Sequence, residues 1–161
     1  MASEDVRWLS HEEQLAWRAY LRGSRLLEKA LDDDLRDVCQ LTEYELISML
    51  SEAPGQRMRM SHLADGIVQS RSRVTHTVAR MEKAGLVERH ASASDGRGVV
   101  AVMTHKGRDL LVDAAPTHVR GVRQHLVDLA SREDFAALGR IFDEVKQRPV
   151  YVVAHDTGEP R

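Results

Sequence analysis

With 161 residues, the chain is long enough for one domain, or for one domain with an oligomerisation extension. Hydrophobic residues make up 42% of the sequence and aromatic residues only 4%, which favours a helix-rich core over a sandwich of aromatic strands. No apolar run reaches the roughly 18 residues of a membrane span, and the N-terminus carries no secretory pattern. The single cysteine cannot form an internal disulfide. We therefore expect a cytoplasmic protein with no membrane partner.

The net charge of −2 is distributed unevenly along the chain. Residues 57–97 contain eight basic and four acidic side chains, giving +4, whereas the remainder contains 15 basic and 21 acidic side chains, giving −6. A basic segment on an acidic body is typical of a protein that places one element in a DNA groove. The alternative is the ordinary charge of solvated helix faces.

The sequence of residues 10–40 predicts a long first helix. Ser10 followed by Glu13 has the form of a capping box. Apolar or small residues then recur at a spacing near 3.5, at Trp17, Leu21, Ser24, Leu27 or Glu28, Leu31, Leu35 and Val38. A helix of this length has no matching partner inside a small domain, so we expect it to pack against another chain or a C-terminal helix. The acidic triplet at 32–34 is expected to form a solvated face, because adjacent helical residues point apart.

Two shorter helices are expected over residues 42–69. Thr42 and Glu45 have the spacing of a second capping box, and Pro54 with Gly55 ends that helix. A short extended segment from Arg57 leads to the next helix, for which Ser61 is the expected N-cap.

Residues 70–85 predict a helix with two contrasting faces. An apolar seam runs along Val74, Val78 and Met81 at the spacing of one helix face. The opposite face carries Arg73, His76 and Arg80, with Ser72 beside His76. Ser70 is the expected N-cap, and Gly85 suits the left-handed position that follows a helix. Such a helix can pack one side on a core and insert the other into a DNA groove.

Two strands, 86–91 and 99–103, follow this helix and are joined by a tip. Asp95 and Gly96 supply hairpin turn chemistry, and Arg97 lies at the tip. Thr104 is the expected N-cap of a long helix that Pro116 should kink or interrupt. Ser131 with Asp134 opens the last helix, and residues 148–161 form a tail.

The sequence of residues 60–111 resembles the MarR family of bacterial transcriptional regulators. The most diagnostic part is the run Asp95-Gly96-Arg97-Gly98, followed by a strand and by Thr104-x-x-Gly107, downstream of a helix ending in MEKAGLV. The resemblance implies a mainly α fold, in which 42–103 form a winged helix-turn-helix lobe with a two-stranded β-wing, and 10–40 and 104–147 supply dimerisation helices. It also implies a homodimer that binds a pseudo-palindromic double-stranded operator, acts as a repressor and is released by a small molecule.

Chemistry assigns roles to the residues of this lobe. Arg71 and Arg73 are candidates for base or phosphate contacts, because arginine can donate twice to one guanine. Arg80 is expected to meet a phosphate, and Arg97 to enter the minor groove, whose potential attracts arginine. The remaining candidate DNA contacts are hydroxyl and imidazole groups, those of Ser70, Ser72, Thr75 and His76, together with Ser61 and His62 at a helix start.

The signal that such a regulator would sense is less defined. Trp17, Tyr20 and Tyr44 could line an effector cleft of the kind that the resemblance implies, or could belong to a dimer core. Redox sensing at Cys39 is an alternative, set against a buried inert thiol. Metal sensing is another, but His118 and His125 have no companion ligands, so we expect no metal and no cofactor.

Two other classes of function are considered. The sequence contains no phosphate-binding glycine loop, nucleophile elbow or HExxH motif, so we expect no enzymatic activity and no catalytic residues. A winged helix that binds another protein is the remaining competitor. The basic, hydroxyl-rich face of 70–83 disfavours it, because a protein-binding face there should be apolar or acidic.

Overall fold

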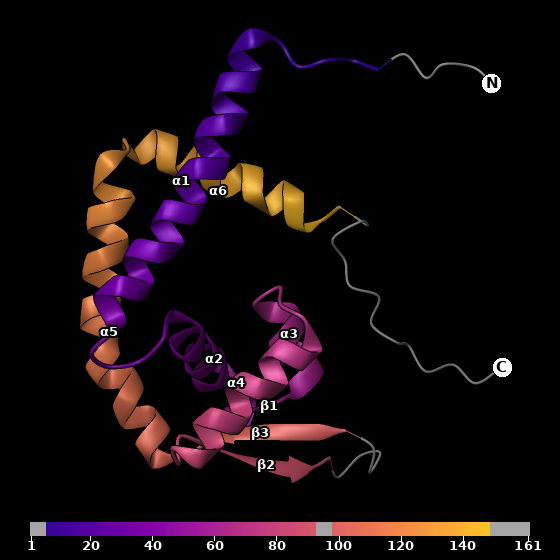
Figure 1. Ribbon diagram of the computed structural model, residues 1–161, viewed down its shortest axis with the longest axis vertical. Coiled ribbons are helices and arrows are strands. Elements are labelled where there is room, and N and C mark those ends of the chain that lie inside the picture. The colour runs from indigo at the N-terminus through magenta and orange to yellow at the C-terminus, as the bar shows by residue number, and fades with distance from the viewer. Residues whose placement is uncertain (1–5, 93–97, 149–161) are drawn as a thin grey trace, which may run out of the picture.

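The computed structural model describes residues 6–92 and 98–148 (Figure 1). Helices dominate, as the sequence predicted, and the strands form one small sheet. In chain order the elements are α1 (His11–Leu35), α2 (Leu41–Glu52), η1 (Pro54–Gln56), β1 (Arg57–Arg59), α3 (Met60–Gly66), α4 (Arg71–Lys83), β2 (Val87–Ala91), β3 (Val99–Met103), α5 (His105–His125), η2 (Val127–Leu129) and α6 (Arg132–Lys146).

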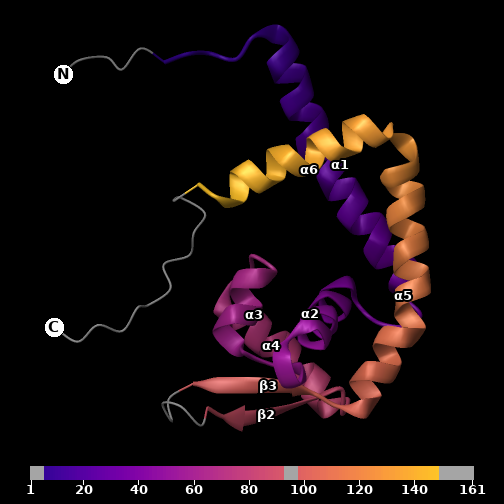
Figure 2. The ribbon, with the colours of Figure 1, turned by 180° about the vertical axis from the view of Figure 1, so that it is seen from behind.

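The elements divide into two regions that both ribbon views separate (Figures 1 and 2). The elements from α2 to β3 gather into one body, which we call the lobe. Helices α1, α5 and α6 form an open arrangement beside and above it, which we call the frame. Within the frame, the rings of Tyr20 in α1 and Phe142 in α6 lie 5.7 Å apart. No helix among the described residues has the length and hydropathy needed to cross a membrane.

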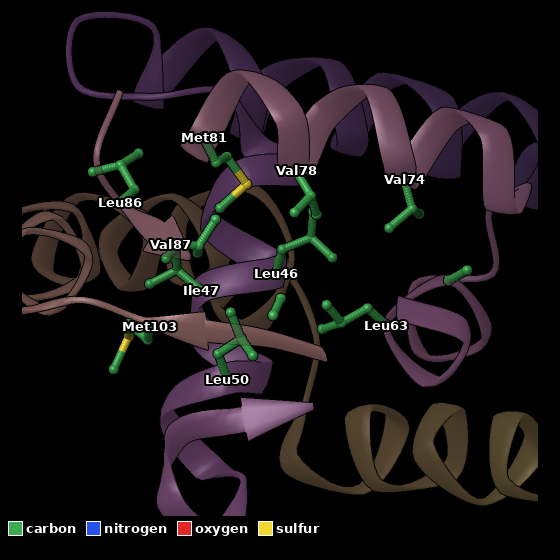
Figure 3. Close-up of a cluster of buried hydrophobic side chains, with 12 residues drawn as sticks. Leu46, Ile47, Leu50, Leu63, Val74, Val78, Met81, Leu86, Val87 and Met103 are labelled. Carbon is green, nitrogen blue, oxygen red and sulfur yellow. The ribbon is translucent and has the colours of Figure 1, made fainter. Parts of the chain in front are cut away.

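The lobe closes around a core built from every one of its helices (Figure 3). The predicted seam of α4 is confirmed, because Val74, Val78 and Met81 are all buried. They face Leu46 of α2 and Leu63 of α3. The other large buried side chains are Ile47, Leu50, Leu86, Val87 and Met103. Removing this apolar surface from water holds α4 against the lobe and leaves its opposite face outside.

The sheet has three strands, in the order β1-β3-β2, where the sequence predicted a two-stranded wing. The hairpin itself is confirmed, with Val87 opposite Met103 and Ala91 opposite Val99. The addition is β1, which pairs antiparallel with the other edge of β3, placing Arg57 opposite Val102. The segment predicted only to be extended is therefore a strand that covers one edge of β3.

Most predicted helix starts are confirmed by hydrogen bonds. The side chains of Ser70, Thr104 and Ser131 each accept from the backbone N–H three residues ahead. Ser10 and Glu13 form both bonds of a capping box. Gly85 has a φ of 75°, the left-handed conformation that was predicted for it.

Two helix starts were predicted wrongly. Helix α2 begins after Gln40 rather than after Thr42. The reason is partly local and partly tertiary, because Glu43 accepts from the N–H of Gln40 in a capping box, while the N–H of Leu41 donates to Asp32 of α1. Helix α3 has its N-cap at Arg59 rather than Ser61, since β1 runs directly into the helix with no turn between them.

Helix α5 links the lobe to the frame. It runs through Pro116 without interruption and changes direction along its length in Figure 1, so Pro116 does not end the helix. Near its start, Gly107 lies so close to the lobe that a Cβ there would stand 2.2 Å from the carbonyl oxygen of Leu86. Only glycine permits this approach of α5 to the strand that follows α4.

The frame contrasts with the lobe in its burial. Helix α6, described along its whole length, buries no side chain, and α1 buries only Leu35. The large exposed apolar residues of these two helices include Leu15, Trp17, Tyr20, Leu26, Phe135, Ile141, Phe142 and Val145. Of the seam predicted for the first helix, Leu35 is buried and Leu21, Leu27 and Leu31 are half-buried, whereas Trp17 and Val38 are exposed.

Candidate nucleic-acid interface

The outer face of α4 is the best candidate for a nucleic-acid interface. Its three exposed basic side chains in the first two turns are Arg71, Arg73 and His76. Among the described residues, neither Arg71 nor Arg73 takes part in an ion pair, so both guanidinium groups are available to a ligand. The fixed fork of a guanidinium suits both phosphate and the edge of guanine.

The hydroxyl groups near the start of α4 are partly committed to the helix. Ser70 caps the helix by accepting from the N–H of Arg73. Thr75 donates its hydroxyl to the carbonyl of Arg71 at 2.8 Å, which leaves its oxygen as an acceptor only. Ser72 is exposed beside them. The predicted residues of α4 therefore lie on one surface, but they differ in the hydrogen bonds that they can donate to a ligand.

Arg80 differs from the other arginines of α4 because its guanidinium has intramolecular partners. Its Nη2 donates to Oε1 of Gln40 at 2.5 Å and to Oε1 of Glu43 at 3.3 Å. Both acceptors belong to the start of α2. A phosphate would have to compete with them for this side chain.

Three other predicted contacts lie away from α4. Ser61 is half-buried as the second residue of α3 and does not cap it, while His62 is exposed. Arg97 lies outside the described residues, within the gap between Ser92 and Gly98. The N–H of Ser92 donates to the carbonyl of Gly98 at 2.7 Å, which closes the hairpin below that tip.

The sheet adds two arginines, Arg57 and Arg59, that sequence reasoning did not single out as contacts. Arg57, Arg59 and His90 lie around an open hollow of about 550 Å³ that Val100 and Val102 also line. The alternation of the Arg57–Arg59 segment was a usable signal, but it became meaningful only when β1 paired with β3. Arg89, next to His90, serves a structural role, because it donates to Glu82 through Nε at 2.9 Å and Nη2 at 2.6 Å. These bonds from Arg89 hold the pKa of Glu82 below its ordinary value.

Comparison with known proteins identifies the architecture. A model of the MarR family matches residues 40–98. The chain is similar to AbsC, a MarR family transcriptional regulator from Streptomyces coelicolor, at 42% identity over 87% of this chain and 95% of that one, with a TM-score of 0.81. The chain belongs to the MarR family.

Further relatives support this membership. Sco3205, a MarR family transcriptional regulator from Streptomyces coelicolor whose structure was solved in complex with DNA, is 40% identical over 92% of this chain and 96% of that one, with a TM-score of 0.83. BldR from Sulfolobus solfataricus shares the fold at 23% identity, covering 84% of this chain and 99% of that one, with a TM-score of 0.72. No curated protein sequence matches the chain. This MarR family chain is a transcriptional regulator.

The aromatic residues predicted to line an effector cleft fall into two separate groups. Trp17 and Tyr20 stack in α1 with their rings 5.6 Å apart, and Tyr20 also meets Phe142. Tyr44 lies instead in the lobe, with its ring 4.3 Å from that of His118 in α5. Burial lowers the pKa of His118, which favours the neutral ring beside Tyr44. A hollow of about 390 Å³ reaches this second pair from the side of α3.

The groups that a redox or metal sensor would use are disfavoured by their surroundings. Burial, followed by the charges of Glu43 and Asp32, raises the pKa of Cys39 to about 11, so its reactive thiolate is scarce at neutral pH. The ring of His118 packs against that of Tyr44, while Nε2 of His125 lies 3.0 Å from Asp34. Across residues 6–92 and 98–148, no cluster of three metal-binding side chains is present.

Proposed function

We propose that this MarR family regulator binds a pseudo-palindromic DNA duplex as a homodimer and represses transcription. The observation that carries the proposal is the division of α4 into a buried seam and an exposed basic face. Val74, Val78 and Met81 fix the helix on the lobe core, while Arg71 and Arg73 project from it without ion-pair partners in the described chain. The structure of Sco3205, a 40% identical relative that was solved in complex with DNA, also supports DNA binding.

In this proposal α4 enters the major groove. Arg71 and Arg73 supply base or phosphate contacts, and the nearby groups of Ser70, Ser72, Thr75 and His76 bond backbone or base edges. Arg97 enters the adjacent minor groove, and Ser61 with His62 lies near a phosphate. The positive charge of residues 57–97 on an otherwise negative chain directs DNA towards this surface.

The second copy is proposed to cover the exposed frame. A stable folded chain rarely leaves this much contiguous apolar helix surface open to water. A two-fold axis through the frame would present two α4 helices to one side of a duplex, about 34–36 Å apart, which is one turn of DNA.

Release by a small molecule is the proposed mode of regulation. Tyr44 lies at the α2–α5 contact, where the lobe meets the frame, whereas Trp17 and Tyr20 lie at the α1–α6 contact within the frame. A ligand beside Tyr44 would change the angle between lobe and frame, and one beside Trp17 and Tyr20 would change how the frame helices pack. The raised pKa of Cys39 makes oxidation the weaker alternative. The exposed arginines of α4 make a protein-binding winged helix the weaker alternative to DNA.

The test uses a duplex selected from a random pool by the full-length protein. We expect its affinity to fall at least about tenfold between 50 and 200 mM salt, because phosphate contacts release counterions. Light scattering at micromolar concentration should give about twice the 18.1 kDa chain mass. An affinity that does not change with salt concentration, or a selection that enriches no duplex, would contradict DNA binding. A monomeric mass would contradict the homodimer.

A further inference from the structure

One contact joins α4 to the start of α2. The guanidinium of Arg80 bridges Gln40 and Glu43, bonding Oε1 of each through the same Nη2. Glu43 keeps only 17% of its side chain exposed, whereas Arg80 keeps 53%. The carboxylate is therefore largely shielded from water, which strengthens its attraction for the cation relative to a surface pair.

The acceptors of Arg80 are themselves fixed. Glu43 uses its second oxygen, Oε2, to accept from the N–H of Gln40 at 3.2 Å. The next N–H, that of Leu41, donates to Oδ1 of Asp32 in α1 at 2.8 Å. The first turn of α2 is thus held by α1 on one side and holds α4 on the other.

We propose that Arg80 is a positioning residue that ties α4 to α1 through the first turn of α2 and makes no phosphate contact. This inference rests on the proposed DNA-binding function and replaces the phosphate role expected for Arg80 from the sequence. The chain of contacts runs from Asp32 to Leu41, through Gln40 and Glu43, to Arg80. It fixes the angle of α4 against α1 of the frame. That angle determines how well the α4 helices of two copies fit the two half-sites of one duplex.

The substitution Glu43→Gln separates the two roles by the sign of its effect. If Arg80 bound phosphate, removing the carboxylate would free the guanidinium and delete a negative charge near DNA, so affinity would rise. If Arg80 positions α4, affinity for the selected duplex should fall about three- to tenfold, because the bridge is weakened. Glu52→Gln is the matched control, since it makes the same change at the exposed end of α2.

Arg80→Ala provides the second measurement, in the salt dependence of binding. Loss of a phosphate contact from each copy of a dimer lowers the slope of log affinity against log salt by about 1.8, at roughly 0.9 per contact. We expect Arg80→Ala to weaken binding about three- to tenfold with the slope unchanged, as a positioning role requires. Arg73→Ala should lower the slope.

Asp32→Ala tests the far end of the contact chain. It should weaken DNA binding about threefold with the slope unchanged, since the first N–H of α2 loses its acceptor. Asp33→Ala is its control, because the neighbouring carboxylate pairs with Lys29 of its own helix. Equal effects of the two substitutions would overturn the link to α1.

A measurement without DNA keeps the proposal separable from the proposed function. In a double-mutant cycle of Arg80→Ala and Glu43→Ala, followed by urea unfolding, we expect a coupling of about two- to fivefold in the equilibrium constant. Any one of three results would overturn the positioning role. These are a chain that binds DNA but shows no coupling, a rise in affinity for Glu43→Gln, and a reduced salt slope for Arg80→Ala. If the wild-type chain bound no duplex despite the coupling, the proposed function would fail, and the DNA role of Arg80 with it.

Discussion

The lobe and the frame use similar apolar patterns but bury them differently. In the lobe, Leu46, Leu63 and Met81 have no exposed surface, and three helices and a sheet close around them. In the frame, Trp17 is 51% and Ile141 is 60% exposed. The lobe core is therefore closed within one chain, whereas the frame leaves large apolar side chains exposed, and these are what the proposed homodimer would cover.

Where the two regions meet, Leu35 of α1 and Ala114 of α5 form an apolar cluster with Leu41 and Tyr44 of α2. The acidic triplet of α1, expected to be a solvated face, adds polar contacts. Asp32 accepts from the start of α2, Asp33 pairs with Lys29, and Asp34 meets His125 of α5. Adjacent helical side chains do point apart, as anticipated, and here that divergence lets two of the three reach other elements.

The largest effect is expected from charges placed on the frame. Ile141→Asp combined with Val145→Asp puts two carboxylates on one exposed apolar face of α6. We expect a monomer by light scattering, with affinity for the selected duplex reduced about 10²- to 10⁴-fold, because the second half-site is no longer engaged by a linked copy. Gly139→Asp is the control, since it adds a charge where no other atom lies within 4 Å. A double variant that stays dimeric would place the interface elsewhere.

A core substitution in the lobe should instead reduce the stability of the chain itself. Leu46→Ala removes a fully buried side chain at the centre of the lobe. We expect the free energy of unfolding to fall by about 2–5 kcal/mol in urea titrations, from lost burial and the cavity left behind. Val112→Ala in α5, where the side chain is 65% exposed, should change it by less than about 0.5 kcal/mol. Similar losses at both sites would remove the contrast between lobe and frame.

Two glycine substitutions compare the junction with the open frame. Gly107→Ala forces a Cβ towards the carbonyl oxygen of Leu86 and should cost about 1–3 kcal/mol in unfolding free energy. Gly23→Ala in α1 meets no atom within 4 Å and should add about 0.5–1 kcal/mol, because alanine favours a helix. Thermal or urea unfolding measures both. We expect the two changes in unfolding free energy to have opposite signs. A stabilised Gly107→Ala variant would be inconsistent with the close approach of α5 to the carbonyl oxygen of Leu86.

The smallest effect concerns the bond between α4 and β2. Arg89 lowers the pKa of Glu82 below its ordinary value of 4.5, so this pair stabilises the lobe above that pH and loses its effect as the pH falls through the lowered value. Glu82→Gln should therefore be less stable than the wild type at pH 7, with the difference shrinking towards pH 3. Urea midpoints at both pH values test this, with Glu52→Gln as the control. If the difference in stability between Glu82→Gln and the wild type grew on acidification, the stabilising role of the Glu82–Arg89 pair would be contradicted.

Much of the fold could be predicted because its signals are local. The spacing of Val74, Val78 and Met81 indicated which side of α4 is buried, and that side is buried. The caps at Ser70, Thr104 and Ser131 act over three residues, so they could be read from the sequence directly. The start of α2 was missed, because its capping box uses Gln40 in place of a hydroxyl residue and its first N–H donates to Asp32, nine residues away on another helix.

For the candidate site, the sequence by itself determined which face of α4 is exposed and that this face carries basic side chains. It did so because a helical period fixes the relative direction of side chains within one element. Only the tertiary structure decided what those side chains meet. Arg80 donates to an acceptor 40 residues earlier in the chain, and β1 pairs with a strand more than 40 residues later. The ring of Tyr44 packs against that of His118 rather than joining Trp17 and Tyr20. Such partners depend on how elements pack in space, which no local spacing encodes.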